Sequence, residues 1–330
     1  MNKVKTINGL MKYLRETHNV IIEGSNSKQK LMSIGYFHGY KGYRYIKNPN
    51  NKLIFSEFNE LLAIIEFDNK LKSLLYPQIM FIETAIKSYI LETIIQETNS
   101  ESFSEIYSKL MIGYKEFKKE PEGYKYKKAY KKRLDTFNKI QNSIAKAYES
   151  NNNIITHYFK KDESVPIWAI FEILTLGEFG NLISTFDIKI RKKISKTLSL
   201  NIAFDSKGNL IESIIFSIKD LRNAIAHNNI IFDTRFNNRN INNIVTKVVK
   251  DSTKLSDINF KGITDYLIFI VYILKKLKKT NKEIQKLLND YIKIIENLKS
   301  SVPNNIFDQI ILTNDIKKVI NLKNNLKIIK

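Results

Sequence analysis

Three side chains on one predicted helix, Arg222, Asn223 and His227, have the types and spacing needed for chemistry on a phosphodiester. An imidazole titrates near neutral pH and can give or take a proton. A guanidinium stays charged and can hold two phosphate oxygens, and the amide of Asn223 can position either the imidazole or the phosphate. RNA cleavage without a metal needs these functions, because the neighbouring 2′-hydroxyl must lose a proton while charge develops on the phosphate.

The helix that carries these residues is predicted to have one apolar and one polar face. At about 100° per residue, one stripe collects Ile211, Ile214, Ile218, Leu221 and Ile225. The opposite face collects Ser213, Ser217, Asp220, Asn223 and His227. Asp220 therefore points into the same space as His227 and is a candidate to orient it. Arg222 falls beside the apolar stripe, so its head must reach round the helix, pair with a buried carboxylate or cross into a second subunit.

Residues 222–227 resemble the R-N-x-x-x-H signature of HEPN nucleases, which are all-helical proteins that cut RNA without metal. Asn228 and residues 231–236 resemble more narrowly the Abi-D/Abi-F-type abortive infection proteins of bacteria. Other elements of that family occur in order: a Tyr-rich segment at 35–45, F-D-x-K-L at 67–71, E-x-A-[IL]-[RK] at 83–87 and P-x-W-x-x-x-E-x-x-x-x-G at 166–177. Family members often have His-Arg after the motif histidine. Asn228-Asn229 stands here instead and points to the Abi-F branch.

The resemblance, which covers about residues 5–240, implies a metal-independent endoribonuclease toxin of an abortive-infection or toxin–antitoxin system. It also implies a HEPN-like helical core, a homodimer in which two motif helices share a cleft, and a bound cognate non-coding RNA. Arg222, Asn223 and His227 are then the catalytic residues. Glu83 and Glu172, which lie in matched elements, are candidate acids to orient Arg222 or His227, and Asp68 is another candidate partner for Arg222. An ordinary solvated or ion-paired charge is the alternative role for each of these acids.

The bulk composition fits a folded protein that binds polyanions. The chain has 330 residues, of which 43% are hydrophobic, and a net charge of +21. A folded core is therefore expected, and so large an excess of positive charge favours RNA as a partner. An AT-rich coding sequence, which enriches lysine, asparagine and isoleucine, is the alternative explanation of the charge.

Residues that bind metals or cross membranes are scarce. There is no cysteine, and the four histidines, His18, His38, His157 and His227, have no ligand spacing. We therefore expect no metal site and no cofactor. The first residues lack the apolar core of a signal peptide, and the longest apolar run, 266–274, is too short to span a bilayer. A cytoplasmic protein without membrane attachment is the expectation.

Two segments mix aromatic rings with cations, as single-strand RNA-binding proteins do. In the first, residues 35–45, the candidate RNA-binding residues are Tyr36, Tyr40 and Arg44; alternate tyrosines packing the core are an equal alternative. In the second, residues 114–133, the candidates are Lys125, Lys127, Lys128, Lys131, Lys132 and Arg133. Here RNA binding is favoured over a merely solvated helix face, because few acids offset the cations.

Few prolines and glycines, and apolar residues at helical spacing, predict an all-α fold. We expect an N-terminal Tyr/Gly-rich helical segment (1–55), a HEPN-like core (56–240) with a basic helical insertion at about 105–150, and C-terminal lysine-rich helices (241–330). Helices are predicted over 6–17, from Ser27 to Ile34, from Ser56 to Thr98 with a break or kink at Pro77, and over 241–251, 261–279, 281–299 and 313–328. Trp168 is expected to anchor the core.

The residues leave other functions open. A non-catalytic scaffold that grips RNA phosphates through the same basic surface is the main alternative to a nuclease. A nucleotide-binding protein lacks support, because the chain has no glycine-rich phosphate loop.

Overall fold

The structure, a computed structural model, describes residues 5–237 and 241–329. In these residues the chain is all-helical, as predicted, and strand pairing is limited to three isolated bridges. The helices are α1 (Ile7–His18), α2 (Gly24–Ile34), η1 (Gly35–Lys41), α3 (Phe58–Thr98), α4 (Phe103–Lys109), η2 (Gly113–Phe117), α5 (Tyr124–Glu149), α6 (Asn153–Phe159), α7 (Ile167–Ile173), α8 (Leu176–Ser184), α9 (Ile188–Thr197), η3 (Ile202–Phe204), α10 (Leu210–Ala226), α11 (Asn243–Thr253), α12 (Ile263–Lys276), α13 (Asn281–Ser301), α14 (Asn304–Ile310) and α15 (Asp315–Asn325).

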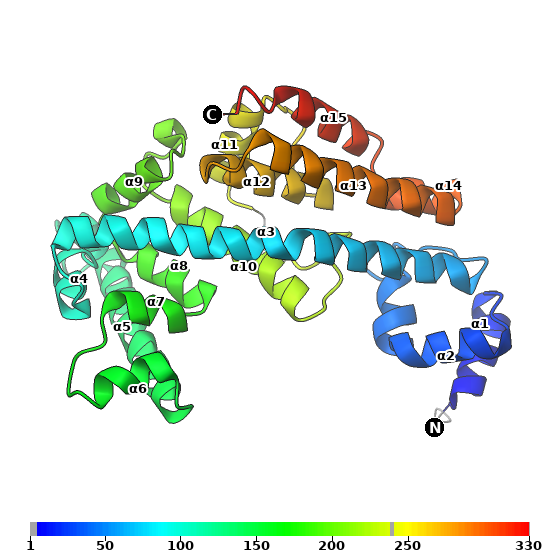
Figure 1. Cartoon of the computed structure of the whole chain (residues 1–330), viewed down its shortest axis with the longest axis horizontal. Helices are drawn as coiled ribbons and strands as arrows, with labels where there is room; N and C mark the ends of the chain where they lie inside the picture. Colours follow the sequence, from blue (N-terminus) through cyan, green and yellow to red (C-terminus); the bar gives the residue numbers. More distant parts are fainter. Residues whose placement is uncertain (1–4, 238–240, 330) are drawn as a thin grey trace.

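The long helix α3 is the axis of the molecule (Figure 1). The N-terminal helices α1 and α2 lie at its beginning, helices α4 to α9 gather around its end, and α12 and α13 run along its other side. The motif helix α10 packs against α3 and α8. Buried apolar side chains form one continuous core from Met11 to Ile329, so the three predicted segments share a single interior.

Helix α3 owes its length to a defined start and an uninterrupted interior. The Glu60 carboxylate accepts hydrogen bonds from the backbone N–H groups of Ser56 and Glu57, at 2.8 and 3.3 Å, and caps the first turn. The helix ends at Asn99, which has a left-handed φ of 50°. We expected a break or kink at Pro77, but α3 continues through this residue as one helix of 41 residues. Packing on several sides stabilises it despite the hydrogen bond that proline cannot donate.

The C-terminal helices form mostly where the sequence predicted them. In α12 every residue from Ile263 to Leu274 is buried, which confirms that the longest apolar run is a core helix. No helix in the described part of the chain is both long and apolar enough to cross a bilayer. The short helix α14 was not predicted. Trp168 was expected in the core but is exposed, and its Nε1 donates to the Glu101 carboxylate at 3.2 Å.

Candidate functional site

The motif helix α10 is fixed at its start by a buried carboxylate. Asp205 accepts hydrogen bonds from the backbone N–H groups of Asn209 and Leu210, at 2.7 and 3.2 Å. These N–H groups have no partner within the helix, so Asp205 acts as its cap. The predicted apolar stripe is buried from Ile211 to Leu221 and partly buried at Ile225. This packing sets which side chains of α10 face outward.

The helix ends at the motif histidine. Asn228 takes the left-handed conformation, with φ of 53°, and donates its N–H to the Ile225 carbonyl. Asn229 N–H donates to the Ala224 carbonyl at 2.8 Å. This pair of bonds is a Schellman cap, which needs a residue at Asn228 that tolerates positive φ. Asparagine after the motif histidine thus has a structural reason, and it leaves His227 exposed on the last turn.

Arg222 pairs with a largely buried acid, which was one of the three arrangements considered for it. Its Nε lies 3.5 Å from Oε2 of Glu83 on α3, and its Nη1 donates to Oδ1 of Asn223 at 3.4 Å. Glu83 also lies 3.5 Å from Nζ of Lys87. The Arg222 side chain is 33% exposed, so the guanidinium is held between α10 and α3 while part of it faces solvent. Glu83 therefore orients Arg222, and Asp68 does not.

Asp68 instead anchors the loop that leaves the motif. Its fully buried carboxylate accepts hydrogen bonds from the backbone N–H groups of Ile231 and Phe232, at 2.9 and 2.8 Å, and from the Tyr43 hydroxyl at 2.8 Å. Lys72 Nζ completes the set at 2.8 Å. Burial, and next the Asp68 charge, raises the pKa of Tyr43, so this hydroxyl stays protonated and donates. The family element at 67–71 thus holds the backbone next to the motif.

The segment from Ile231 to Phe236 joins the motif to the N-terminal helices. Arg235 pairs with Asp233 through Nε and Nη2 and donates to the carbonyl oxygens of Gly42 and Tyr45, at 2.8 and 2.7 Å. Lys47 N–H donates to the Asp233 carboxylate at 2.6 Å. The chain just after η1 is therefore fixed against the end of α10, although some 190 residues separate them in sequence.

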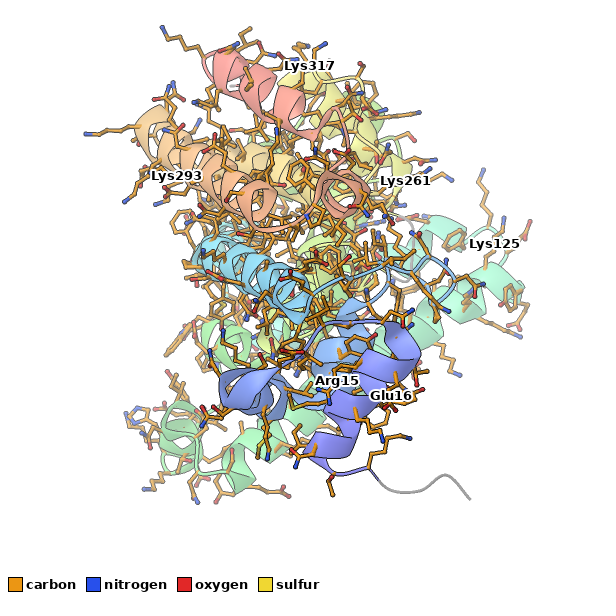
Figure 2. All side chains as sticks on the ribbon, turned by 90° about the vertical axis from the view of Figure 1, so that its right-hand side faces the viewer. Arg15, Glu16, Lys125, Lys261, Lys293 and Lys317 are labelled. Carbon is orange, nitrogen blue, oxygen red and sulfur yellow. The ribbon has the colours of Figure 1, made fainter. Side chains whose placement is uncertain are left out.

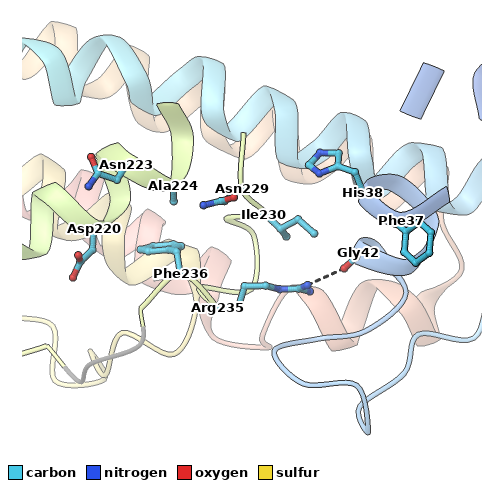
Figure 3. Close-up of a pocket in the computed structure, with 10 residues that line it drawn as sticks. All are labelled: Phe37, His38, Gly42, Asp220, Asn223, Ala224, Asn229, Ile230, Arg235 and Phe236. Carbon is cyan, nitrogen blue, oxygen red and sulfur yellow. Dashed lines mark hydrogen bonds between the residues drawn. The ribbon is translucent and has the colours of Figure 1, made fainter. Parts of the chain in front are cut away.

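A cavity of about 480 Å³ opens at this junction. Figure 3 shows Asp220 and Asn223 on one side, Phe37 and His38 on the other, and Asn229 and Ile230 between them. Asp220 lines the cavity and pairs with its neighbour Lys219 at 2.7 Å. Arg222 and His227 are not among the lining residues. Nor, among the described residues, do three or more histidine or acidic side chains gather as a metal site would require.

The predicted site residues are thus brought together only in part. Arg222, Asn223 and Glu83 form one contact group, and His227 lies one turn away on the same helix. Asp220 lines the cavity beside Asn223, but its ion pair is with Lys219. Glu172 is exposed on α7 and has no contact with Arg222 or His227 in the described structure, so we do not assign it an orienting role.

The basic residues predicted to bind RNA fall into an exposed group and a buried one. Lys125, Lys127, Lys128, Lys131 and Lys132 are exposed on α5, whose start projects from the body of the molecule beside Lys125 (Figure 2). Arg133 is buried instead: it donates to the Tyr107 carbonyl at 2.8 Å and lies over the Tyr107 ring. Arg133 therefore fixes α5 to its neighbours and is not available to an RNA phosphate.

The Tyr-rich segment also packs inward more than predicted. Tyr40 is buried, and its ring stacks on Tyr36 at a centroid distance of 5.6 Å. Arg44 lies over the Tyr40 ring and 3.5 Å from Nε2 of His18. Tyr40 is thus a core residue rather than a stacking surface for a base. The exposed ring of the segment is its neighbour Phe37.

Three cavities connect the motif to the basic helix. Asp220 and Phe236 line both the cavity at the motif and a second one of about 650 Å³. Asn181 lines the second cavity and also a groove of about 830 Å³ along α5. The lining of this groove includes Lys125, Lys127, Lys128, Lys131, Lys132 and Lys139. Neighbouring cavities that share lining residues therefore lie between these lysines and Asn223 on the last turn of α10.

The fold and the site define an all-helical protein with an R-N-x-x-x-H helix that ends at an exposed histidine. A family model described as Abi-like protein matches residues 29–233, and the chain therefore belongs to the Abi-like protein family. No curated protein and no solved structure gives a significant match. Family membership indicates a role in abortive infection. The matched range contains α10, Asp233 and the N-terminal side of the junction described above, and it ends before Arg235 and Phe236.

Two residues of the junction, His38 and Asn228, were not predicted as site residues. His38 lines the cavity at the motif, and its Nε2 lies 3.4 Å from Nδ2 of Asn228. The signal available in the sequence was the position of each inside a family element, the Tyr-rich segment for His38 and the residue after the motif for Asn228.

Proposed function

We propose that this protein is a metal-independent endoribonuclease toxin of an abortive-infection or toxin–antitoxin system, with a HEPN-like core and a site at Arg222, Asn223 and His227. The observation that carries the proposal is the end of α10, where an exposed imidazole follows a partly exposed guanidinium on one helix. The lysine-lined groove of α5, which shares lining residues with the cavities between it and this end of α10, supports RNA as the substrate. The site of action is the cytoplasm, where RNA is abundant.

The proposed chemistry is transesterification by the 2′-hydroxyl. Arg222 stabilises the negative charge that develops on the phosphate, and Glu83 and Asn223 keep its head in place for that contact. His227 transfers one of the two protons that the reaction moves. The resemblance to HEPN nucleases adds a homodimer to the proposal, in which the motif helices of two copies share a cleft.

The decisive experiment uses purified protein, single-stranded RNA and excess EDTA. We expect cleavage to products with a 2′,3′-cyclic phosphate and a 5′-hydroxyl, because no metal-activated water is involved. The control is the same oligonucleotide with a 2′-deoxy sugar at the cleaved position, which should stay intact. RNA that persists in EDTA, or equal cleavage of the 2′-deoxy strand, would refute the proposal.

The groove along α5 is proposed to hold RNA by its phosphates. Replacing Lys125, Lys128 and Lys131 by glutamate should lower RNA affinity and reduce the slope of log K against log salt by about 2, since each phosphate contact on a single strand contributes roughly 0.7. Fluorescence anisotropy at several salt concentrations measures this slope.

The matched control makes the same change of net charge elsewhere. Lys282, Lys293 and Lys317 are exposed on α13 and α15, and none of them lines the α5 groove. Figure 2 shows Lys293 and Lys317 away from Lys125. Their replacement by glutamate should leave the slope within about 0.7 of the original value. Equal effects of the two triple variants would show that general charge, and not the α5 groove, binds the RNA.

A cognate non-coding RNA is the proposed regulator, because the excess of positive charge favours a long-lived RNA complex. Sequencing of the RNA that copurifies with the protein tests this part. One dominant species supports a dedicated ribonucleoprotein, whereas a mixture that follows the abundance of cellular RNAs argues against it.

A non-catalytic RNA-binding scaffold is the second candidate. It is favoured by the ion pair between Arg222 and Glu83, which offsets the charge that a transition state would use. Salt-sensitive RNA binding without cleavage in EDTA would select this function.

A further inference from the structure

The cavity at the motif has a second wall that comes from a distant part of the chain. Phe37 and His38 of η1 face Asn223 of α10 across it, as Figure 3 shows. The Arg235 bonds to the Gly42 and Tyr45 carbonyls hold the chain after η1 in this position. An imidazole other than His227 is therefore fixed within one chain at the end of the motif helix.

His38 is contacted by Asn228, the residue that comes immediately after His227 in the sequence. Lys72 Nζ donates to Oδ1 of Asn228 at 2.9 Å, so the amide oxygen of Asn228 faces the ammonium group and its NH₂ group faces His38. The distance from Nδ2 of Asn228 to Nε2 of His38 is 3.4 Å. Because an amide NH₂ only donates, Nε2 of His38 must accept. This contact therefore turns the accepting nitrogen of the His38 ring, Nε2, toward Asn228.

The orientation of Asn228 rests on a buried group. Lys72 is held by Asp68 at 2.8 Å, and Asp68 also anchors the backbone at Ile231 and Phe232. The left-handed backbone of Asn228 belongs to the cap of α10. One network thus fixes the end of the motif helix and the imidazole of His38 together.

The surroundings of His38 also fit single-stranded RNA. The Phe37 ring beside it is 75% exposed, and Nζ of Lys41 lies 5.0 Å from the ring centroid. An exposed ring next to a cation offers a face for a base and a charge for the adjoining phosphate. A nucleotide bound on Phe37 would bring its sugar toward the cavity that His38 lines.

We propose that His38 is the second proton-transfer group of the ribonuclease site and that Asn228 positions it. This inference rests on the proposed function. The 2′-hydroxyl of the substrate takes the place of Asn228 as the donor to Nε2 of neutral His38. Nε2 then accepts the proton of this hydroxyl, and the 2′-oxygen attacks phosphorus. The bond from phosphorus to the 5′-oxygen breaks, and protonated His227 gives its proton to that oxygen. The products are a 2′,3′-cyclic phosphate and a 5′-hydroxyl, and solvent restores both imidazoles.

The test is the pH dependence of single-turnover RNA cleavage in EDTA. The wild-type protein should give a bell-shaped profile, because one imidazole must be neutral and the other protonated. His38→Gln should lower the rate near neutral pH by about 10²- to 10⁴-fold and abolish the limb at low pH. His227→Gln should abolish the limb at high pH instead.

Asn228→Gly separates positioning from folding, since glycine keeps the left-handed backbone and removes only the amide. The single-turnover rate should fall in this variant while both limbs of the pH profile remain, because His38 is still present but is no longer held by the Asn228 amide. His18→Gln is the matched control. His18 is another histidine of the N-terminal region, but it contacts Arg44 and does not line the cavity. The pH profile of RNA cleavage should therefore not change in this variant. Circular dichroism confirms that each variant is folded.

The outcomes separate the two proposals. Suppose that the wild type cleaves RNA and that His227→Gln does not. If His38→Gln then keeps the wild-type rate and the low-pH limb, the role of His38 is overturned while the proposed function stands. The second proton-transfer group would then come from elsewhere, such as a partner copy. If the wild type cleaves no RNA in EDTA, the proposed function and this inference both fall.

Discussion

Replacing His227 by glutamine is expected to lower the single-turnover rate of RNA cleavage by about 10²- to 10⁴-fold, which is the usual contribution of a positioned acid or base. Glutamine keeps a polar side chain of similar reach but cannot protonate the leaving 5′-oxygen. His227 is exposed at the last turn of α10, so the change should not alter folding. RNA affinity, measured separately, should stay within a few-fold of wild type.

His157→Gln is the control for this prediction. His157 is also exposed at the end of a helix, α6, but lies against Tyr158 and lines none of the three connected cavities. The single-turnover rate of RNA cleavage by the His157→Gln protein should match that of the wild type. A His227→Gln protein that cleaves RNA as fast as the His157→Gln protein would remove the motif histidine from the chemistry.

Asp68→Asn is expected to destabilise the protein by about 3–5 kcal/mol, the cost of removing one partner of a buried ion pair. The carboxylate accepts from Tyr43, Ile231 and Phe232 and pairs with Lys72. The asparagine amide has one acceptor oxygen, and its NH₂ group cannot accept a hydrogen bond. Several of the four donors around the carboxylate therefore lose their acceptor. Urea unfolding followed by circular dichroism measures the loss.

Glu66→Gln provides the comparison on the same helix. Glu66 pairs with Lys70 four residues on, as Asp68 pairs with Lys72, but the Glu66 pair is exposed to solvent. Its removal should cost at most about 0.5 kcal/mol. If the two variants unfold at the same urea concentration, Asp68 does not anchor the loop after the motif in the way described.

The sequence predicted those features of the fold and site that depend on local periodicity. The apolar stripe of α10 lies inward from Ile211 to Leu221, and the run at 266–274 is a buried helix. Glu83 was identified as a candidate partner of Arg222 because it occupies a matched element, and the ion pair is present. The first two features are defined by residues within a few turns of one helix, whereas the ion pair joins α3 to α10 and was indicated only by the family resemblance.

The other features that depend on distant partners were not predicted. Asp68 looked like a possible partner of Arg222, yet its ligands include backbone N–H groups 163 and 164 residues away. Tyr40 and Arg133 lie in segments with the composition of RNA-binding segments. Tyr40, however, packs against His18 of α1, and Arg133 packs against Tyr107. The role of Asn228 also depends on Lys72 and His38, which spacing along α10 cannot reveal.

The most direct test of the site compares the cleavage rates of Arg222→Ala, His227→Gln and the protein carrying both changes, in EDTA and at saturating protein. If both side chains act on one phosphodiester, each single variant is severely impaired, and the double variant is slower than the worse single variant by no more than a few-fold. A double variant that cleaves RNA at the wild-type rate would contradict the assignment of this helix end as the site.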